Sequence, residues 1–400
     1  MDLTSDHPYW FVKNGLLQTF PHLKTEVSCD VAVVGGGITG AMVAYRLSQL
    51  GFQVALLDRR DVGLGSTSAS TALLQYEIDV PLIDMAKKIG RENAERAYRL
   101  SHQSIDDIES LVQEVGSDCG FRRKVSIYLA HDRPAAKHLA VEARARRETG
   151  LDVEYLRDSE LQEQFGLQGA AALITHQAAS CDAYRLAHDL LAAAVQNGAQ
   201  VFDRTDVTEF DIQPDHVVLK TSREVDVHAK RVVIAAGYEA QNLLKERVVD
   251  LDNTYAFVSE PLADVSPWNL DWMLWEAREP YLYLRCTDDG RILAGGEDDK
   301  FHSPTRRDAV LGKRVKAIRQ KVRELIPDLE WEVEFAWAGT FGTTQDGLAY
   351  IGESPEYQNC LFALGFGGNG ITFSSIATQL IADQLRNIPN QHTDLFRFGR

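Results

Sequence analysis

Cysteine is scarce in this 400-residue chain, and no two cysteines stand close together. The five are Cys29, Cys119, Cys181, Cys286 and Cys360. An odd number with no CxxC pair argues against a disulfide framework and against a zinc site made of cysteine pairs. The spacing fits a reducing compartment, and we predict a cytoplasmic protein without a metal site.

The chain also has fewer positive than negative charges, and it has no long apolar run. Against 42 Lys and Arg stand 58 Asp and Glu, which gives a formal net charge of -16. Nucleic acid and anionic membranes are polyanions, so neither is an expected partner. No apolar stretch approaches the roughly 20 residues that span a bilayer, and the first residues lack the basic-then-apolar layout of a signal peptide. We therefore predict no membrane span.

A strand, a glycine turn, a helix and a second strand follow one another in CDVAVVGGGITGAMVAYRLSQLGFQVALLD, residues 29–58. Residues 31–34 have the non-alternating apolar pattern of a buried parallel strand. Gly35, Gly37 and Gly40 fit GxGxxG, and Ile38 and Thr39 open the helix whose N–H groups would face a pyrophosphate. Asp58 closes the second strand, where a carboxylate can hold a ribose hydroxyl. The unit predicts a bound dinucleotide.

A loop rich in serine and threonine follows Asp58. Its hydroxyl and amide groups can bind phosphate or sugar oxygens, and its small side chains allow the backbone to run beside a flat ring. The candidate contacts in this segment are Arg59, Arg60, Ser66, Thr67, Ser68, Thr71, Ala72 and Leu73.

A second GxGxxG, at Gly365, Gly367 and Gly370, lies between a strand and the last long helix. Only 30 residues follow Gly370, too few for a second dinucleotide fold. A helix N-terminus favours negative charge by roughly 0.3–1 kcal/mol, which suits the N1 and O2 region of a reduced flavin. The candidate contacts are Gly367, Gly368, Asn369, Gly370, Ile371 and Thr372. The alternative is a turn that only packs the last helix.

These segments together resemble the D-amino acid oxidase (DAO) superfamily of FAD-dependent oxidoreductases, nearest its glycine/sarcosine oxidase and gamma-glutamylputrescine oxidase-like branch. The resemblance includes STSASTALLQ, VVIAAGYEA, YLYLRCTDDGRILAGGEDD and GFGGNGITFSSIATQLIADQL. It implies further cofactor contacts at Val207, Ala236 and Gly237. A lone cysteine is usually an apolar filler, so we expect non-covalent FAD despite Cys286 and Cys360.

The resemblance also implies an α/β fold in which a Rossmann-like FAD-binding domain is interleaved with an antiparallel-sheet substrate domain. We assign residues 28–80, 175–240 and 335–395 to the FAD-binding domain, and residues 81–174 and 241–334 to the substrate or cap domain. Residues 1–27, with their aromatic cluster, are expected to form an arm that packs on the body.

One departure from the family pattern concerns the substrate. Phe341 and Gly342 stand where many members have Arg-Pro, and that arginine can carry a substrate carboxylate. The nearest replacement is Arg285; the alternatives are that it pairs with Glu297 or points to solvent. The candidate catalytic and pocket residues are Arg285, Tyr283 and Tyr255, with Trp337 and Phe341 as aromatic walls.

The expected reaction is hydride transfer from the C–N bond of a small amine or amino acid to flavin N5, giving an imine that hydrolyses. No acid–base residue is required if the amine arrives neutral. The electron acceptor is oxygen or an unidentified carrier. A 2-hydroxy-acid dehydrogenase of the same superfamily and a flavin-bearing electron-transfer subunit remain alternatives. A nicotinamide dehydrogenase would leave the second glycine turn unexplained.

Overall fold

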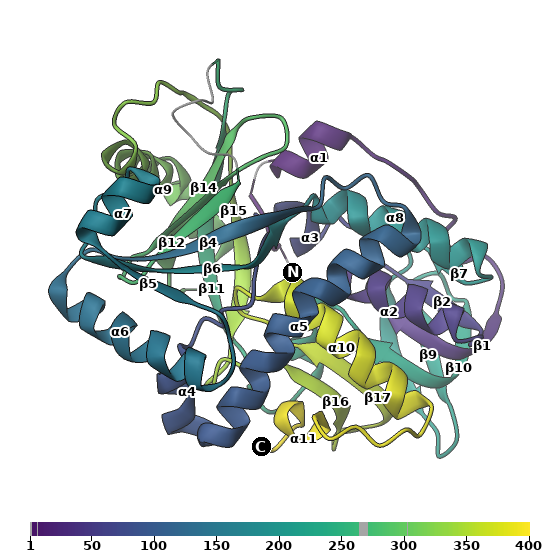
Figure 1. Ribbon diagram of the computed structural model, residues 1–400. Coiled ribbons are helices and arrows are strands. Elements are labelled where there is room, and N and C mark those ends of the chain that lie inside the picture. Colours follow the sequence, from purple (N-terminus) through teal and green to yellow (C-terminus); the bar gives the residue numbers. More distant parts are fainter. Residues whose placement is uncertain (1, 6, 264–270, 302) are drawn as a thin grey trace.

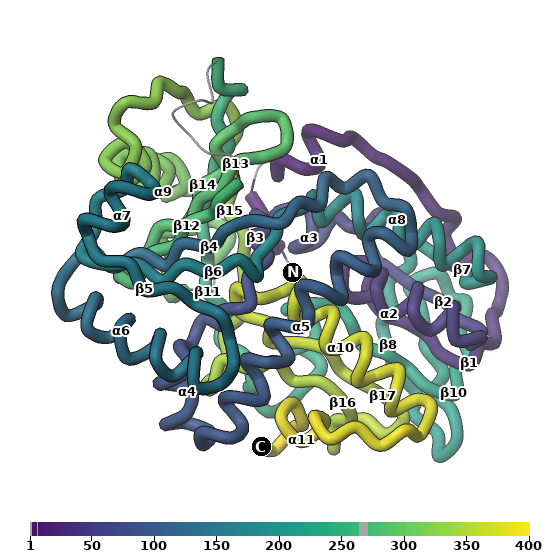
Figure 2. The backbone as a smooth tube through the Cα atoms, viewed as in Figure 1, coloured from purple at the N-terminus to yellow at the C-terminus, as the bar shows by residue number. Residues whose placement is uncertain are grey.

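The computed structural model describes residues 2–5, 7–263, 271–301 and 303–400. Two sheets dominate it, each with its own helices (Figure 1). The first sheet lies with α2, α8 and α10 on the right of the view, and the second lies with α6, α7 and α9 on the left. The tube in Figure 2 shows that both sheets take strands from distant parts of the chain. The mixed α/β architecture expected from the sequence is confirmed.

The first sheet is built around parallel strands in the order β16-β17-β10-β1-β2-β7. Its strands are β1 (Val27–Val34), β2 (Val54–Leu57), β7 (Gln200–Phe202), β8 (Val207–Ile212), β9 (Val217–Thr221), β10 (Asp226–Ile234), β16 (Tyr350–Ser354) and β17 (Tyr357–Leu364). β16 runs antiparallel to β17, and β8 and β9 form a hairpin beside β10. Residues 31–33 and all of β2 are buried, as a strand covered on both faces must be.

Helices cover this sheet and pack on one another. They are α2 (Ile38–Gln49), α4 (Leu82–Ile89), α5 (Arg91–Val115), α8 (Ala183–Gln196), α10 (Gly370–Leu385) and α11 (Thr393–Phe396). Ile105 and Ile108 of α5 are buried against this core at helical spacing. Gly90 separates α4 from α5 with φ +86°, a conformation that suits glycine.

The second sheet has the order β15-β11-β14-β13-β12-β4-β6-β3. Its strands are β3 (Leu73–Gln75), β4 (Arg122–Ala130), β5 (Glu154–Arg157), β6 (Ala171–Ser180), β11 (Asp250–Ser259), β12 (Trp272–Glu276), β13 (Leu282–Cys286), β14 (Ile292–Asp299) and β15 (Val333–Thr343). All described pairs are antiparallel except β12 with β4. The remaining elements are α1 (Tyr9–Asn14), α3 (Ser66–Ala69), α6 (Arg133–Glu148), α7 (Asp158–Phe165), η1 (Gly237–Leu243) and α9 (Pro304–Leu325).

The expected domain limits differ from the sheets in three places. Residues 73–75, 175–180 and 335–343, which the sequence assigns to the FAD-binding domain, belong to β3, β6 and β15 of the second sheet. Helix α5, which the sequence assigns to the substrate domain, packs on α10 beside the first sheet. The chain passes from one sheet to the other without a change in composition, so no signal in the sequence marks these limits.

The first residues pack on the body as an arm. The backbone N–H of Ser5 donates to Ala338 O over 3.0 Å, which attaches the arm to β15. Tyr9 and Trp10 of α1 are buried against Trp337.

Candidate cofactor and substrate site

A cavity of about 440 Å³ lies where the two sheets meet. Its lining combines the starts of α2 and α10 with residues of β11, β12, β13 and β15. Among the expected cofactor contacts, those that line it are Gly35, Gly37, Ile38, Thr39, Asp58, Arg59, Arg60, Ser66, Thr67, Thr71, Ala72, Leu73, Val207, Ala236, Gly237, Gly367, Gly368, Asn369, Gly370, Ile371 and Thr372. Segments separated by more than 300 residues therefore share one cavity.

Gly40 and Ser68 do not line the cavity. A Cβ on Gly40 would overlap the carbonyl oxygen of Gly35, so Gly40 allows the helix to approach the turn. Ser68 is buried and donates its hydroxyl to Gly65 O over 3.1 Å. Both residues lie behind the wall of the cavity and not in it, and their expected contact with a cofactor is corrected accordingly.

The first glycine turn is held by side chains on either side of it. Gly35 has φ +111°, which a residue with a Cβ rarely adopts. Thr67 Oγ1 accepts the N–H of Ile38 over 3.0 Å, which ties the serine-rich loop to the start of α2. Ser66 Oγ lines the same cavity, is buried and has no hydrogen-bond partner. A buried hydroxyl of this kind is expected to bind a polar ligand.

Asp58 binds the backbone of its own surroundings. Its Oδ2 accepts the N–H of Gly36 over 2.6 Å, and its Oδ1 accepts the N–H of Arg60 over 2.7 Å. Burial raises the pKa of this carboxyl to about 6, against the lowering effect of the two N–H groups. Arg59 and Arg60 both pair with Glu239. This end of the cavity is thus polar and has both signs of charge.

The second glycine turn is tied to the segment that follows β3. Asn369 donates its side-chain N–H to Glu77 O over 2.9 Å and accepts the N–H of Asp79 over 3.2 Å. Asp79 Oδ2 in turn accepts the N–H of Gly368 over 2.7 Å. Burial raises the pKa of Asp79. The turn is therefore fixed to the segment after β3 as well as to the last helix.

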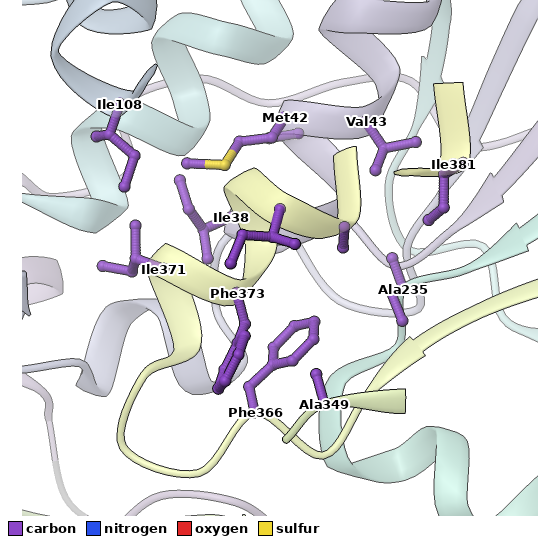
Figure 3. Packing of buried hydrophobic residues seen from close by; sticks show 14 of the residues in the cluster. Ile38, Met42, Val43, Ile108, Ala235, Ala349, Phe366, Ile371, Phe373 and Ile381 are labelled. Carbon is purple, nitrogen blue, oxygen red and sulfur yellow. The ribbon is translucent and has the colours of Figure 1, made fainter. Parts of the chain in front are cut away.

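The two helices that begin at the glycine turns are neighbours. The hydroxyls of Thr39 in α2 and Ser374 in α10 are 2.7 Å apart. Figure 3 shows Ile38 and Ile371 in one apolar cluster. Packing the helices together brings both N-termini to one cavity, and helix N-termini favour anionic groups.

Aromatic side chains from the second sheet line the other end of the cavity. Tyr283, Trp337 and Phe341 lie where the sequence indicated. Trp275 and Tyr281 also line it, although the sequence analysis did not select them. Tyr281 is two residues before Tyr283, and alternation along an extended segment would have placed both on one face.

Tyr255 is outside the cavity. Thr254 and Ala256 line it, so Tyr255 between them points to the opposite face of β11. There it is fully buried and donates its hydroxyl to Asp299 Oδ2 over 2.9 Å. The expected pocket role of Tyr255 is therefore wrong.

Arg285 is also outside the cavity. It is 2% exposed and donates to three carbonyl oxygens, those of Thr71 at 2.8 Å, Cys181 at 3.1 Å and Cys286 at 3.2 Å. Its expected role as a carboxylate anchor is corrected, because the guanidinium is behind the Thr71 backbone. The alternative pairing with Glu297 is wrong too, since Glu297 binds Arg314 and Lys321.

Other candidate groups lie elsewhere. Cys286 and Cys360 are buried and do not line the cavity. Within the described part of the chain no group of three His, Cys, Asp or Glu could hold a metal ion. No helix of that part is long and apolar enough to cross a membrane.

The glycine turns, the buried Ser66 hydroxyl and the paired helix N-termini fit a long dinucleotide cofactor with an anionic centre. Together with the doubly covered parallel sheet they indicate a dinucleotide-binding fold. The family model for FAD dependent oxidoreductases (DAO) matches residues 30–384. The chain belongs to this family, and FAD is its cofactor.

Known relatives extend over most of the chain. It is 29% identical over 371 residues to glycine oxidase of Geobacillus kaustophilus, covering 88% of this chain and 92% of that protein. The crystal structure of glycine oxidase from that organism superposes with a TM-score of 0.76 at 24% identity, covering 91% of this chain and 96% of that chain.

Two other relatives are similar at lower identity. Gamma-glutamylputrescine oxidoreductase of Escherichia coli is 24% identical over 383 residues, which cover 92% of this chain and 86% of that protein. A putative Rieske 2Fe-2S iron-sulfur protein of Bacillus subtilis is 24% identical over 399 residues, covering 98% of this chain and 75% of that protein.

Proposed function

We propose that this FAD-dependent oxidoreductase oxidises the C–N bond of a small amine or amino acid. The observation that carries the proposal is the shared cavity, in which Tyr281 and Tyr283 of the second sheet line the same space as the turn at Gly367 and Gly368. The relatives include glycine oxidase and gamma-glutamylputrescine oxidoreductase, whose names refer to an amino acid and an amine.

In this proposal the residues of the chain bind the cofactor and orient the substrate. The start of α2, with Thr67 and Ser66, is proposed to hold the pyrophosphate, and Val207, Ala236 and Gly237 the adenosine end. The start of α10 is proposed to lie at the ring end. Bound FAD supplies the hydride acceptor. FAD is proposed to be non-covalent, because Cys286 and Cys360 are away from the cavity.

The second sheet is proposed to hold the substrate. Trp337, Phe341 and Tyr283 provide apolar surface that excludes water from the reacting carbon. A neutral amine requires no base for hydride loss, so the residues act by placing the substrate rather than by moving protons.

An anaerobic screen tests this function. The purified yellow protein is mixed with primary amines, N-methyl amino acids, D- and L-amino acids and 2-hydroxy acids, and flavin bleaching is recorded. Bleaching by amines or amino acids supports the proposal. Bleaching by 2-hydroxy acids alone would assign C–OH oxidation instead, and bleaching by no compound would favour an electron-transfer subunit. Reoxidation of the bleached protein with and without oxygen then identifies the class of electron acceptor.

A further inference from the structure

Asp79 brings a carboxylate to the second glycine turn. Its side chain is exposed and lines the cavity together with Gly367 and Gly368. Oδ2 of Asp79 accepts the N–H of Gly368 over 2.7 Å. The carboxylate therefore lies beside the start of α10 and is open to a molecule bound in the cavity.

The turn leaves room for this carboxylate because its glycines lack side chains. A Cβ on Gly367 would lie 2.5 Å from Asp79 Oδ2, and a Cβ on Gly368 would lie 2.7 Å from Oδ1. The backbone N–H of Asp79 donates to Asn369 Oδ1 over 3.2 Å, so the turn also holds the main chain of Asp79. These contacts fix the position of the charge relative to the start of α10.

No cation among the described residues neutralises this charge. Burial raises the pKa of the Asp79 carboxyl, and the N–H of Gly368 alone opposes the increase. The basic side chains among the described lining residues are Arg59 and Arg60, which pair with Glu239. Where water is excluded, an unbalanced charge acts strongly on groups a few ångströms away.

The proposed placement of FAD brings the flavin ring to this charge. The start of α2 is proposed to hold the pyrophosphate, which leaves the start of α10 for the ring end. A reduced flavin carries negative charge around N1 and O2, and a helix N-terminus favours that charge. The Asp79 carboxylate at the same turn has the opposite effect, because like charges repel. Charge near N1 is one of the means by which a protein tunes a flavin.

We propose that the Asp79 carboxylate lowers the reduction potential of bound FAD by placing a negative charge beside the flavin ring at the start of α10. This inference rests on the proposed position of the ring, and it goes beyond the proposed function because it holds for any substrate. Asp79 makes the reduced flavin less stable, so electrons taken from a substrate pass more readily to the acceptor. The residue thus favours the return of the flavin to its oxidised form.

Asp79→Asn tests the charge. The side-chain oxygen of asparagine can still accept the N–H of Gly368, so the turn is kept while the charge is lost. The FAD-loaded parent and variant are reduced stepwise with dithionite beside reference dyes, at a pH of about 8, where a carboxyl is ionised. We expect the equilibrium constant for reduction to rise by about tenfold or more in the variant, which for two electrons is about 30 mV. An unchanged or lower potential would overturn the proposal.

Two further variants separate the charge from the support of the turn. Asp79→Ala removes both the charge and the acceptor, and its potential should rise as well. A rise in Asp79→Ala alone would show that the residue only supports the turn, and loss of FAD from both variants would show that it only forms the site; either result overturns the proposal. Asp132→Asn is the matched control, because Asp132 Oδ1 accepts the N–H of Ala135 over 2.8 Å and does not line the cavity. It should keep the parent potential, and an equal rise there would also overturn the proposal.

The potential is measured without a substrate, which separates this inference from the proposed function. Dithionite reduces the flavin whether or not an amine does. A raised potential in Asp79→Asn supports the inference even if no amine bleaches the parent protein, in which case the proposed function alone fails. Equal potentials in the parent and Asp79→Asn overturn the inference even if amines or amino acids bleach the flavin, and the proposed function then stands.

Discussion

Trp10 donates its indole N–H to the carbonyl oxygen of Ser70 over 2.7 Å. The carbonyls on either side are held in the same way. Trp337 donates to Ala69 O over 2.9 Å, and Arg285 donates to Thr71 O over 2.8 Å. The Arg285 guanidinium is also 5.4 Å from the centre of the Trp10 ring. Three consecutive carbonyls of the cofactor loop are therefore fixed by side chains from distant segments.

These three hydrogen bonds stabilise the backbone of the next residue, Ala72. Ala72 lines the cavity and has φ +48°, a left-handed conformation that costs an alanine free energy. Such a conformation persists where surrounding contacts hold the backbone in place. Here the side chains of Trp10, Trp337 and Arg285 hold the three carbonyls that precede Ala72. The N-terminal arm thus contributes directly to the shape of the cavity.

Trp10→Phe tests the contribution of the arm. The ring is kept and the donor is lost, so Ser70 O loses its indole partner. We expect the free energy of unfolding to fall by about 1–3 kcal/mol and FAD to bind more weakly. Urea denaturation and FAD titration measure the two effects. Trp331→Phe is the matched control, because the Trp331 indole N–H is buried without a partner and its loss should not destabilise. Equal effects in both variants would argue against the loop contact.

Arg285→Ala tests the corrected role of that arginine. Three carbonyl oxygens lose a charged donor, and we expect the free energy of unfolding to fall by about 3 kcal/mol. FAD affinity should fall because Thr71 is released. Among flavin-reducing compounds the loss should be uniform, whether or not they carry a carboxylate. Arg144→Ala, at an exposed ion pair in α6, should change stability by less than about 1 kcal/mol. A selective loss for carboxylate substrates in a stable Arg285 variant would return this residue to the substrate site.

Gly37→Val tests the first glycine turn. Gly37 has ordinary φ of -79°, so the substitution adds no backbone strain. The valine side chain would enter the cavity, and its Cβ would lie 2.9 Å from Thr67 Oγ1. We expect a folded, colourless protein. The control is Gly312→Ala in α9, where a Cβ meets no atom within 4 Å. It should stay yellow and gain up to about 1 kcal/mol of stability. A fully flavin-loaded Gly37→Val protein would contradict the assignment.

How much the sequence could predict depended on how local each feature is. The glycine turns, the serine-rich loop and the closing helix are short motifs with their own chemistry, and the structure brings them to one cavity. The prediction for Tyr255 was wrong because the strands that pair with β11 determine which face of β11 meets the cavity. Arg285 shares its face with Tyr283, but the loop at Thr71 lies between it and the cavity. Asp79 reaches the turn at Gly368 only through tertiary packing, which no local sequence pattern reveals.

Asp298 gives the stability of the protein a pH dependence. Burial raises the pKa of its carboxyl to about 7, and the charges of Glu279 and Asp79 add to the increase. Hydrogen bonds from Thr254 and Tyr281 oppose it. The carboxyl is neutral below this pH and charged above it.

The same shift has a consequence for stability without any ligand. The folded-state pKa of Asp298 lies above its ordinary value of 3.8, so ionisation is less favourable in the folded protein than in the unfolded chain. The stability of the parent protein should decline on this account as pH rises from about 4 to about 7. Asp298→Asn removes the titration, so its advantage in free energy of unfolding should grow over that range and then level off. Urea denaturation of both proteins at several pH values measures the difference. A constant difference across the range would show that Asp298 ionises as freely in the folded protein as in the unfolded chain.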